Sequence, residues 1–190
     1  QGYDVAYYSE KLKKQKFDFD ESMTKPYFEQ SKVLDGLLDI VSELFDLRFE
    51  SVKSPIWHEC VKVYDVYEQD KLSSRIYFDL EARSTKRGGA WMNDYETHFV
   101  DTQSKTHLPS AFVVCNFAPS TANSPSLLRH DDVVTLFHEM GHALHHILGK
   151  CSQRDISGIN GVAWDVVEFP SQFLENFAYE KAILKQFAFH

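Results

Sequence analysis

The segment from Thr135 to His146 reads TLFHEMGHALHH and contains the pattern His-Glu-x-x-His. On a helix, residues four apart lie on the same face, so the imidazoles of His138 and His142 can reach one metal ion while Glu139 lies beside it. One helical turn would then supply two nitrogen ligands and a carboxylate base. The spacing predicts a zinc site that activates water, with Glu139 as the general base that takes the proton.

The flanks of this motif favour a single amphipathic helix. Asp131 and Asp132 come where such a helix would begin, and Gly149 comes where it would end. An apolar stripe lies between them, made of Val133, Val134, Leu136, Phe137, Met140, Ala143, Leu144, Ile147 and Leu148. We therefore expect one face of the helix to pack against a core and the other to carry the metal ligands.

Two histidines leave a catalytic zinc site incomplete, because such sites usually take three protein ligands and a water. His145 and His146 are the nearest candidates, but three histidines from His138 to His145 would span ~10 Å along one straight helix and could not converge. A third histidine six residues after the second would indicate the metzincin arrangement, yet that position is Leu148. The third ligand must come from another element.

Glu168 is the better donor, within the segment AWDVVEFPSQFLEN at 163–176. Gly158 and Gly161 allow the preceding loop to reverse the chain, and Pro170 favours the start of a second helix near Glu168. Two antiparallel helices would then face each other across the metal.

Two neighbours and one alternative bear on this assignment. Gln172 and Glu175 follow Glu168 by four and seven residues, so they share its helical face and could orient the histidines. Alternatively, Asp165 is the N-cap of the second helix and Glu168 closes a capping box, which would make Glu168 structural.

The composition is that of a globular protein. The 190 residues, 43% hydrophobic, are enough for one core, and no linker divides residues 1–190, so we expect a single piece. The three cysteines, Cys60, Cys115 and Cys151, are odd in number and far apart, which favours reduced thiols and a cytoplasmic protein.

Charge and hydropathy exclude two classes of partner. The net charge is -8 and the basic cluster from Lys11 to Lys16 is short, so we expect no nucleic-acid partner and interpret the cluster as a solvated helix face. No apolar run has the length of a membrane span, and the first residues lack the features of a signal peptide, so we expect no membrane partner.

The rest of the chain is organised as follows. We expect helices over 4–14 and 27–45, the second beginning just after Pro26, and strands over 48–52, 60–67 and 75–80 with a polar turn at 68–74. A flexible break at 86–90 precedes a strand at 111–117. These elements predict an α+β fold, mainly α-helical, in which a zinc-binding helix pair accompanies a small, largely antiparallel sheet.

Two further features are open at this level. The strand at 111–117 is either a sheet edge that binds the backbone of a peptide substrate or an ordinary core strand. His58, His98, His107 and His130 are interpreted as surface or capping residues. The chain lacks an initiator Met, and its last helical pattern, Phe173 to His190, has no terminator, so we expect a piece of a longer protein.

The sequence resembles the thimet oligopeptidase and oligopeptidase A family of zinc metallopeptidases, which are gluzincins. The resemblance runs over essentially the whole chain and rests on FHEMGHALH at 137–145, DVVEFPSQFLEN at 165–176 and, more loosely, YFDL at 77–80 and KRGGA at 86–90. It implies one zinc ion bound by His138, His142 and Glu168, with Glu139 as the base. It also implies a cytosolic enzyme that cleaves short peptides in a deep channel.

Two departures from the family pattern matter. The family usually has Phe at the position of Met140, a mild apolar exchange. Its members are several times longer, and the tyrosine and histidine residues that contact substrate lie beyond the residues matched here. We therefore expect zinc binding with little peptidase activity in isolation, and activity only with the remainder of the parent polypeptide.

Two other functions stay open. A dipeptidyl carboxypeptidase of the same family would trim two residues from a free C-terminus instead of cutting internally. A non-catalytic zinc module would close the coordination shell with a fourth protein ligand, for which Cys151 is the only nearby thiol.

Overall fold

The computed structural model describes residues 4–18 and 21–190. The helices are α1 (Asp4–Phe17), α2 (Gln30–Phe45), α3 (His130–Ile147), α4 (Phe169–Glu175) and α5 (Lys181–Phe187). The strands are β1 (Leu47–Ser51), β2 (Lys62–Glu68), β3 (Lys71–Glu81), β4 (Trp91–Glu96), β5 (Phe99–Val100), β6 (Thr106–His107) and β7 (Ser110–Phe117). Single 3-10 turns lie at Glu21–Met23, Lys25–Tyr27, Arg154–Ile156 and Asn176–Tyr179.

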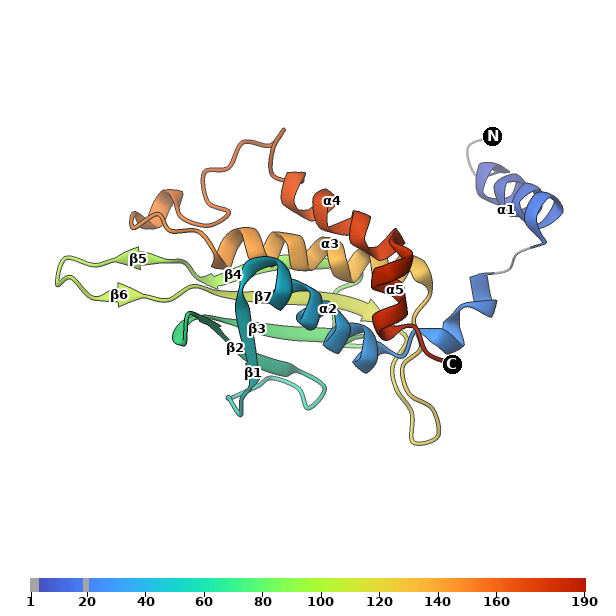
Figure 1. The fold of residues 1–190 in the computed structure, drawn as a ribbon, viewed down its shortest axis with the longest axis horizontal. Coiled ribbons are helices and arrows are strands. Elements are labelled where there is room, and N and C mark those ends of the chain that lie inside the picture. The colour runs from blue at the N-terminus through green and yellow to red at the C-terminus, as the bar shows by residue number, and fades with distance from the viewer. Residues whose placement is uncertain (1–3, 19–20) are drawn as a thin grey trace.

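A five-stranded sheet with helices on one face forms the body of the molecule (Figure 1). Its strand order is β1-β2-β3-β7-β4, and all neighbours are antiparallel except β3 and β7, which are parallel. A separate two-stranded ribbon pairs β5 with β6. The expected α+β fold with a largely antiparallel sheet is confirmed.

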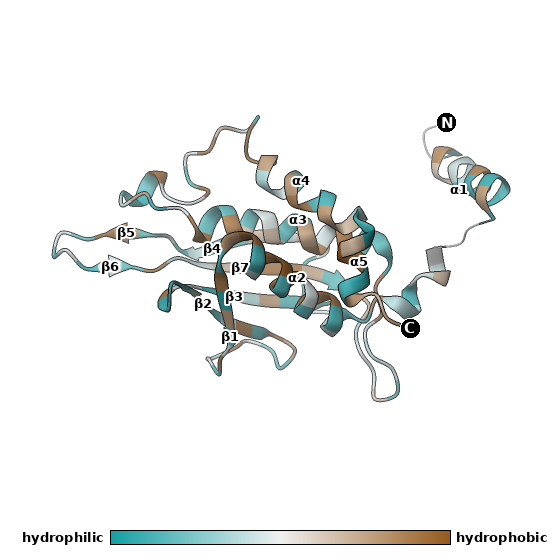
Figure 2. Cartoon of the chain, in the orientation of Figure 1, coloured by the Kyte–Doolittle hydropathy of each residue, from teal (hydrophilic) through white to brown (hydrophobic). Residues whose placement is uncertain are grey.

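The core lies between this sheet and the helices. Figure 2 shows hydrophobic residues concentrated on α2, α3 and the strands that lie beneath them. The buried side chains include Leu34 and Leu37 of α2, Ile76 of β3, Val113 of β7 and Phe137 of α3. Burial of this stripe fixes which face of α3 points away from the core and is left for ligands.

The hairpin between β2 and β3 is tighter than the sequence suggested. We expected a polar turn over residues 68–74, but β2 continues to Glu68 and β3 begins at Lys71. The two residues between them, Gln69 and Asp70, both adopt positive φ angles, 47° and 64°, which is the conformation of a two-residue hairpin turn. Polar residues at 71–74 therefore belong to a strand.

Two helices also differ from expectation. The first extends to Phe17 rather than residue 14, and none of its residues is buried. The second begins at Gln30 instead of Tyr27, because Pro26 lies in a separate 3-10 turn at Lys25–Tyr27. No helix in the described part of the chain is long and apolar enough to cross a membrane.

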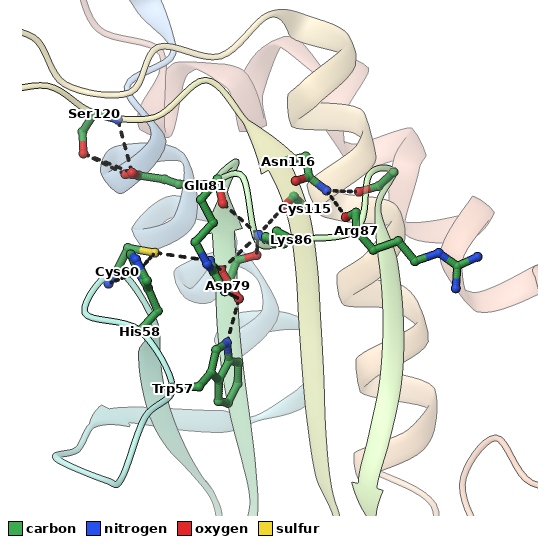
Figure 3. Close-up of polar contacts among 12 residues, drawn as sticks. Trp57, His58, Cys60, Asp79, Glu81, Lys86, Arg87, Cys115, Asn116 and Ser120 are labelled. Carbon is green, nitrogen blue, oxygen red and sulfur yellow. Dashed lines mark hydrogen bonds and ion pairs between the residues drawn. The ribbon is translucent and has the colours of Figure 1, made fainter.

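The expected flexible break at 86–90 is anchored. The side chain of Lys86 is only 5% exposed, and its Nζ donates to the carbonyl oxygens of Asp79 (2.7 Å), Glu81 (2.9 Å) and Cys115 and to the Asp79 carboxylate (3.0 Å). Figure 3 shows this ammonium group lying between β3 and β7. Because a buried cation needs such compensation, Lys86 fastens the loop that leads into β4.

Strand β4 has no counterpart in the expected elements, and its position corrects another expectation. It pairs with β7 and forms the last strand of the sheet, so β7 is a central strand with neighbours on both sides. The interpretation of 111–117 as a sheet edge is therefore wrong, and the ordinary core strand is correct. The edge beside α3 belongs to β4.

Candidate metal centre

Helix α3 carries the His-Glu-x-x-His segment, as expected. Its N-cap is Arg129, whose main-chain N–H donates to Oδ2 of Asp132 at 2.8 Å, so Asp132 satisfies one of the free donors at this end. Leu136, Phe137 and Met140 are fully buried in the core. His138 and His142 project from the opposite face, where both are partly exposed.

Helix α4 approaches α3 unusually closely at Gly141. A Cβ atom at this position would lie 2.5 Å from Cα of Ser171 and 2.6 Å from the carbonyl oxygen of Pro170. Any side chain here would therefore push α4 away from α3. Glu168 is the N-cap of α4, so the glycine at position 141 allows its carboxylate to reach the histidines.

The structure brings the three predicted ligands together. The donor atoms of His138, His142 and Glu168 all lie within 4.8 Å of one another. Oε2 of Glu168 lies 3.2 Å from Nε2 of His138 and 3.1 Å from Nε2 of His142. No other group of three possible metal-binding side chains occurs in the part of the chain that the structure describes.

The second nitrogen of His138 is also engaged. Its Nδ1 lies 2.6 Å from Oε1 of Glu175, which follows Glu168 by about two helical turns. This contact fixes the ring so that Nε2 faces Glu168. Gln172 does not have the expected role of orienting the histidines. It is exposed, and among the described residues it forms no hydrogen bond with either of them.

Glu139 is buried beside the cluster and is not one of its members. Burial raises the pKa of its carboxyl group to about 7, and the negative charge of Glu168 adds to that rise. The charge of His138 and the main-chain N–H of Met92 in β4 act in the opposite direction. A carboxyl group that titrates near neutrality can both accept and return a proton.

The pKa values of two predicted ligands move toward the forms that bind metal. Burial lowers the pKa of His142, so the neutral ring is favoured even though Glu168 acts against this. Burial alone would raise the pKa of Glu168, but the hydrogen bond from Ser171 (2.9 Å) and the charges of His142 and His138 lower it. A neutral imidazole and an ionised carboxylate are the species that coordinate zinc.

The other residues that the sequence analysis considered for this site lie away from the three converging donor atoms. His146 is fully buried and its Nε2 lies 2.9 Å from the carbonyl oxygen of Glu96, while His145 lines an apolar cavity between α3 and α4. The N-cap of α4 is Glu168 itself, so the alternative in which Asp165 caps this helix is wrong. Cys151 makes its contact with the carbonyl oxygen of Gln153.

The donor set fits a zinc ion. Two imidazole nitrogens and one carboxylate oxygen are the ligands that catalytic zinc sites of this class use, and the three converge without a further protein ligand. A ligand set of three leaves a coordination position for water or substrate.

A helix with two histidines and a buried glutamate, faced by a carboxylate from the next helix, is the arrangement of His-Glu-x-x-His peptidases. The chain belongs to peptidase family M3, whose family model matches residues 1–190. It is 40% identical to oligopeptidase A of Escherichia coli over 186 residues, which is 97% of this chain and 27% of that protein. It is 38% identical to dipeptidyl carboxypeptidase of Escherichia coli and 34% identical to saccharolysin of Saccharomyces cerevisiae, covering 28% of each. The chain therefore spans about a quarter of the length of these relatives.

Proposed function

We propose that this chain is the metal-binding part of a zinc-dependent oligopeptidase that hydrolyses peptide bonds in short peptides. His138, His142 and Glu168 would hold one zinc ion, and Glu139 would be the general base. The observation that carries this proposal is the convergence of the three donor atoms within 4.8 Å, with a buried carboxyl group beside them. The names of the relatives support peptides as the substrate class.

The residues at the proposed site would have separate catalytic and positioning roles. A bound zinc ion would polarise the peptide carbonyl and make its water ligand acidic. Glu139 would accept a proton from the attacking water and return it to the leaving amine, a role for which a pKa near neutrality is well placed. Glu175 holds the ring of His138, and Ser171 holds the carboxylate of Glu168 through its hydroxyl group.

The free edge of β4 is the proposed place for the peptide backbone. β4 is the last strand of the sheet, and the main-chain N–H of Met92 points at Glu139, so this edge borders the proposed metal site. A peptide in extended conformation could add to this edge through main-chain hydrogen bonds. Its scissile bond would then lie over α3.

Zinc binding is the direct test. Crystals soaked with zinc should show anomalous scattering at the zinc edge between His138, His142 and Glu168, and competition with a chromophoric chelator should give one ion per chain. His142→Ala should lose most of the zinc affinity. His107→Ala should retain it, because His107 is outside the proposed site and lies against Asp101. A peak elsewhere, or equal affinities for the two variants, would contradict the proposal.

Activity is expected only in the longer parent protein. The residues described here include no established donor for the developing oxyanion besides the metal, and transition-state charge of this kind needs one. We expect the isolated chain to bind zinc with little turnover. A turnover comparable to that of a full-length relative would refute this expectation.

A dipeptidyl carboxypeptidase is the second candidate, because the whole of this chain is 38% identical to part of an enzyme of that name. Peptides with a free and an amidated C-terminus distinguish the two activities in the parent protein. An oligopeptidase cleaves both, whereas an enzyme that recognises the terminal carboxylate cleaves only the free form. A structural zinc module would cleave neither.

We also propose a cytoplasmic location. One relative at 36% identity is named a probable cytosolic oligopeptidase A, although another at 38% is named an organellar form of chloroplasts and mitochondria. The three free cysteines are consistent with a reducing compartment. Fractionation of cells that express the tagged parent protein would test the location.

A further inference from the structure

Helix α3 lies against the edge strand β4 and is hydrogen-bonded to the end of that strand. Near the start of β4, the main-chain N–H of Met92 faces the carboxyl group of Glu139. At the end of β4, the carbonyl oxygen of Glu96 lies 2.9 Å from Nε2 of His146. Glu139 and His146 are seven residues apart, which is two helical turns, so both project from the same face of α3 toward the strand.

His146 is built into this position on both sides of its ring. It is fully buried, and because Nε2 lies against a carbonyl oxygen, this nitrogen carries the proton. The other nitrogen, Nδ1, packs directly against Gly158, where a Cβ would lie only 2.3 Å away. Gly158 has φ +63°, so the backbone conformation and the close approach both favour glycine there.

The same corner of the fold is tied to the end of β4 by further contacts. Oγ1 of Thr97 donates to the carbonyl oxygen of Ser157 at 3.2 Å, and Nδ1 of His98 lies 2.9 Å from the carbonyl oxygen of Cys151. His146 is therefore enclosed between β4 and the segment that follows α3. A rotation of its ring would break the hydrogen bond to Glu96 and disrupt the packing against Gly158.

The hydrogen bond of His146 sets the distance between the end of β4 and α3. Four residue steps of strand, ~13 Å, separate Glu96 from Met92, so the height of the strand beside Glu139 depends on how its end is held. A peptide that adds to the free edge of β4 would lie in the space between the strand and the metal-binding face of α3. Its distance from the metal would depend on where the strand is held.

We propose that His146 is a positioning residue for peptide binding: by donating to the Glu96 carbonyl, it holds the edge strand β4 at the height above α3 that a peptide substrate requires. The inference rests on the proposed function. It assigns a role to a histidine that is not a metal ligand, and it predicts that peptide affinity and zinc affinity respond separately to its replacement.

The test compares His146→Gln, which keeps an N–H donor, with His146→Leu, which keeps bulk and loses the donor. Binding of a dansyl-labelled, C-amidated octapeptide of alternating Ala and Gly would be measured by fluorescence in the zinc-loaded parent protein, with Glu139→Gln present throughout so that the peptide is not cleaved. We expect affinity to fall about fivefold to tenfold in His146→Leu and less than twofold in His146→Gln. Zinc affinity should change less than twofold in both. Equal peptide affinities for the two variants, or a parallel loss of zinc, would overturn the inference.

Amide hydrogen exchange provides a readout that does not depend on substrate. His146→Leu should increase exchange at residues 92–97 relative to His146→Gln, without a change in the β1–β2 hairpin. If the parent protein with His146 unchanged binds zinc but no peptide, the proposed function fails while the exchange data still decide the role of His146. Unchanged exchange at residues 92–97 in His146→Leu would refute that role.

Discussion

The pKa values of two buried carboxyl groups in this chain are shifted in opposite directions. Asp79 on β3 is 2% exposed and Glu139 on α3 is 6% exposed. Burial would raise the pKa of Asp79, but hydrogen bonds from Arg83, Trp57 and Lys86 outweigh it and lower the pKa to about 2. Burial raises the pKa of Glu139 to about 7, since it has no comparable set of donors.

The difference teaches that donors, not depth, decide what a buried carboxyl group does. Asp79 accepts from both terminal nitrogens of Arg83 at 2.7 and 2.8 Å, from Nε1 of Trp57 at 2.8 Å and from Lys86, so its charge is fully compensated and fixes the framework. Glu139 is left poised between its two protonation states beside the proposed metal ligands. Four predictions test this contrast, in order of decreasing effect.

The largest effect is expected for Glu139→Gln in the parent protein. Removing the base should lower peptide hydrolysis about 1,000-fold, because general-base catalysis contributes on that order, whereas the amide preserves the shape of the side chain. Zinc content should be unchanged, since Glu139 is not one of the converging donors. Steady-state kinetics and metal analysis on the same sample check both parts, and retained activity would place the base elsewhere.

Replacement of the compensated carboxylate should affect stability instead. Asp79→Asn leaves the buried ammonium of Lys86 without its counter-charge, and breaking a buried pair of this kind costs about 3 kcal/mol. Urea denaturation monitored by circular dichroism measures the loss. Zinc affinity should stay within twofold, and a stability loss below the error of the measurement would show that Lys86 is satisfied by carbonyl groups alone.

Acid should reproduce part of this loss. The pKa of Asp79 is lower in the folded protein, about 2, than its ordinary value of 3.8, so its contribution is present above pH 4 and is lost as the pH falls toward 2. The shift corresponds to about 2 kcal/mol. Unfolding free energies of the metal-free chain between pH 5 and pH 2 should fall more steeply than those of Asp79→Asn. Parallel curves would contradict the assignment.

The smallest effect is expected for Glu175→Gln. The amide can still contact Nδ1 of His138 but has lost its charge, and changes to partners of metal-binding histidines weaken metal affinity about tenfold. Chelator competition gives the ratio. The matched Gln172→Glu change, on an exposed position of the same helix, should leave the affinity nearly unchanged.

The sequence predicted the helices of the site better than it predicted the sheet. The spacing of His138 and His142, the apolar stripe and the loop before Glu168 are local patterns, and the structure brings these three residues together. Their role as zinc ligands stays a prediction. Gly141 could have been noticed as a glycine inside a helix, but its purpose depends on the backbone of Pro170, which is distant in sequence.

The sheet was harder because its burial pattern is set by non-local pairing. Trp91–Glu96, WMNDYE, has neither a regular alternation of apolar and polar residues nor the β-branched residues that mark strands, and its pairing with β7 decides its conformation. The role of Lys86 was equally hidden. A lysine shortly before two glycines indicates a solvated loop. Its burial is explained only by the carboxylate of Asp79 and the carbonyl groups of Asp79, Glu81 and Cys115.

The parallel pairing of β3 with β7 has a consequence for the order of folding. β2 and β3 are joined by two residues and can pair as soon as both exist. β4 joins the sheet only through β7, which lies between β4 and β3. Ser110 of β7 pairs with Glu96 of β4 and with Arg75 of β3, so the β4–β7 pair closes the shorter loop and is expected to form before the parallel pair. A nascent chain would thus form two antiparallel units, β2–β3 and β4–β7, and the strand that borders the proposed metal site would be paired before the parallel contact joins the two units.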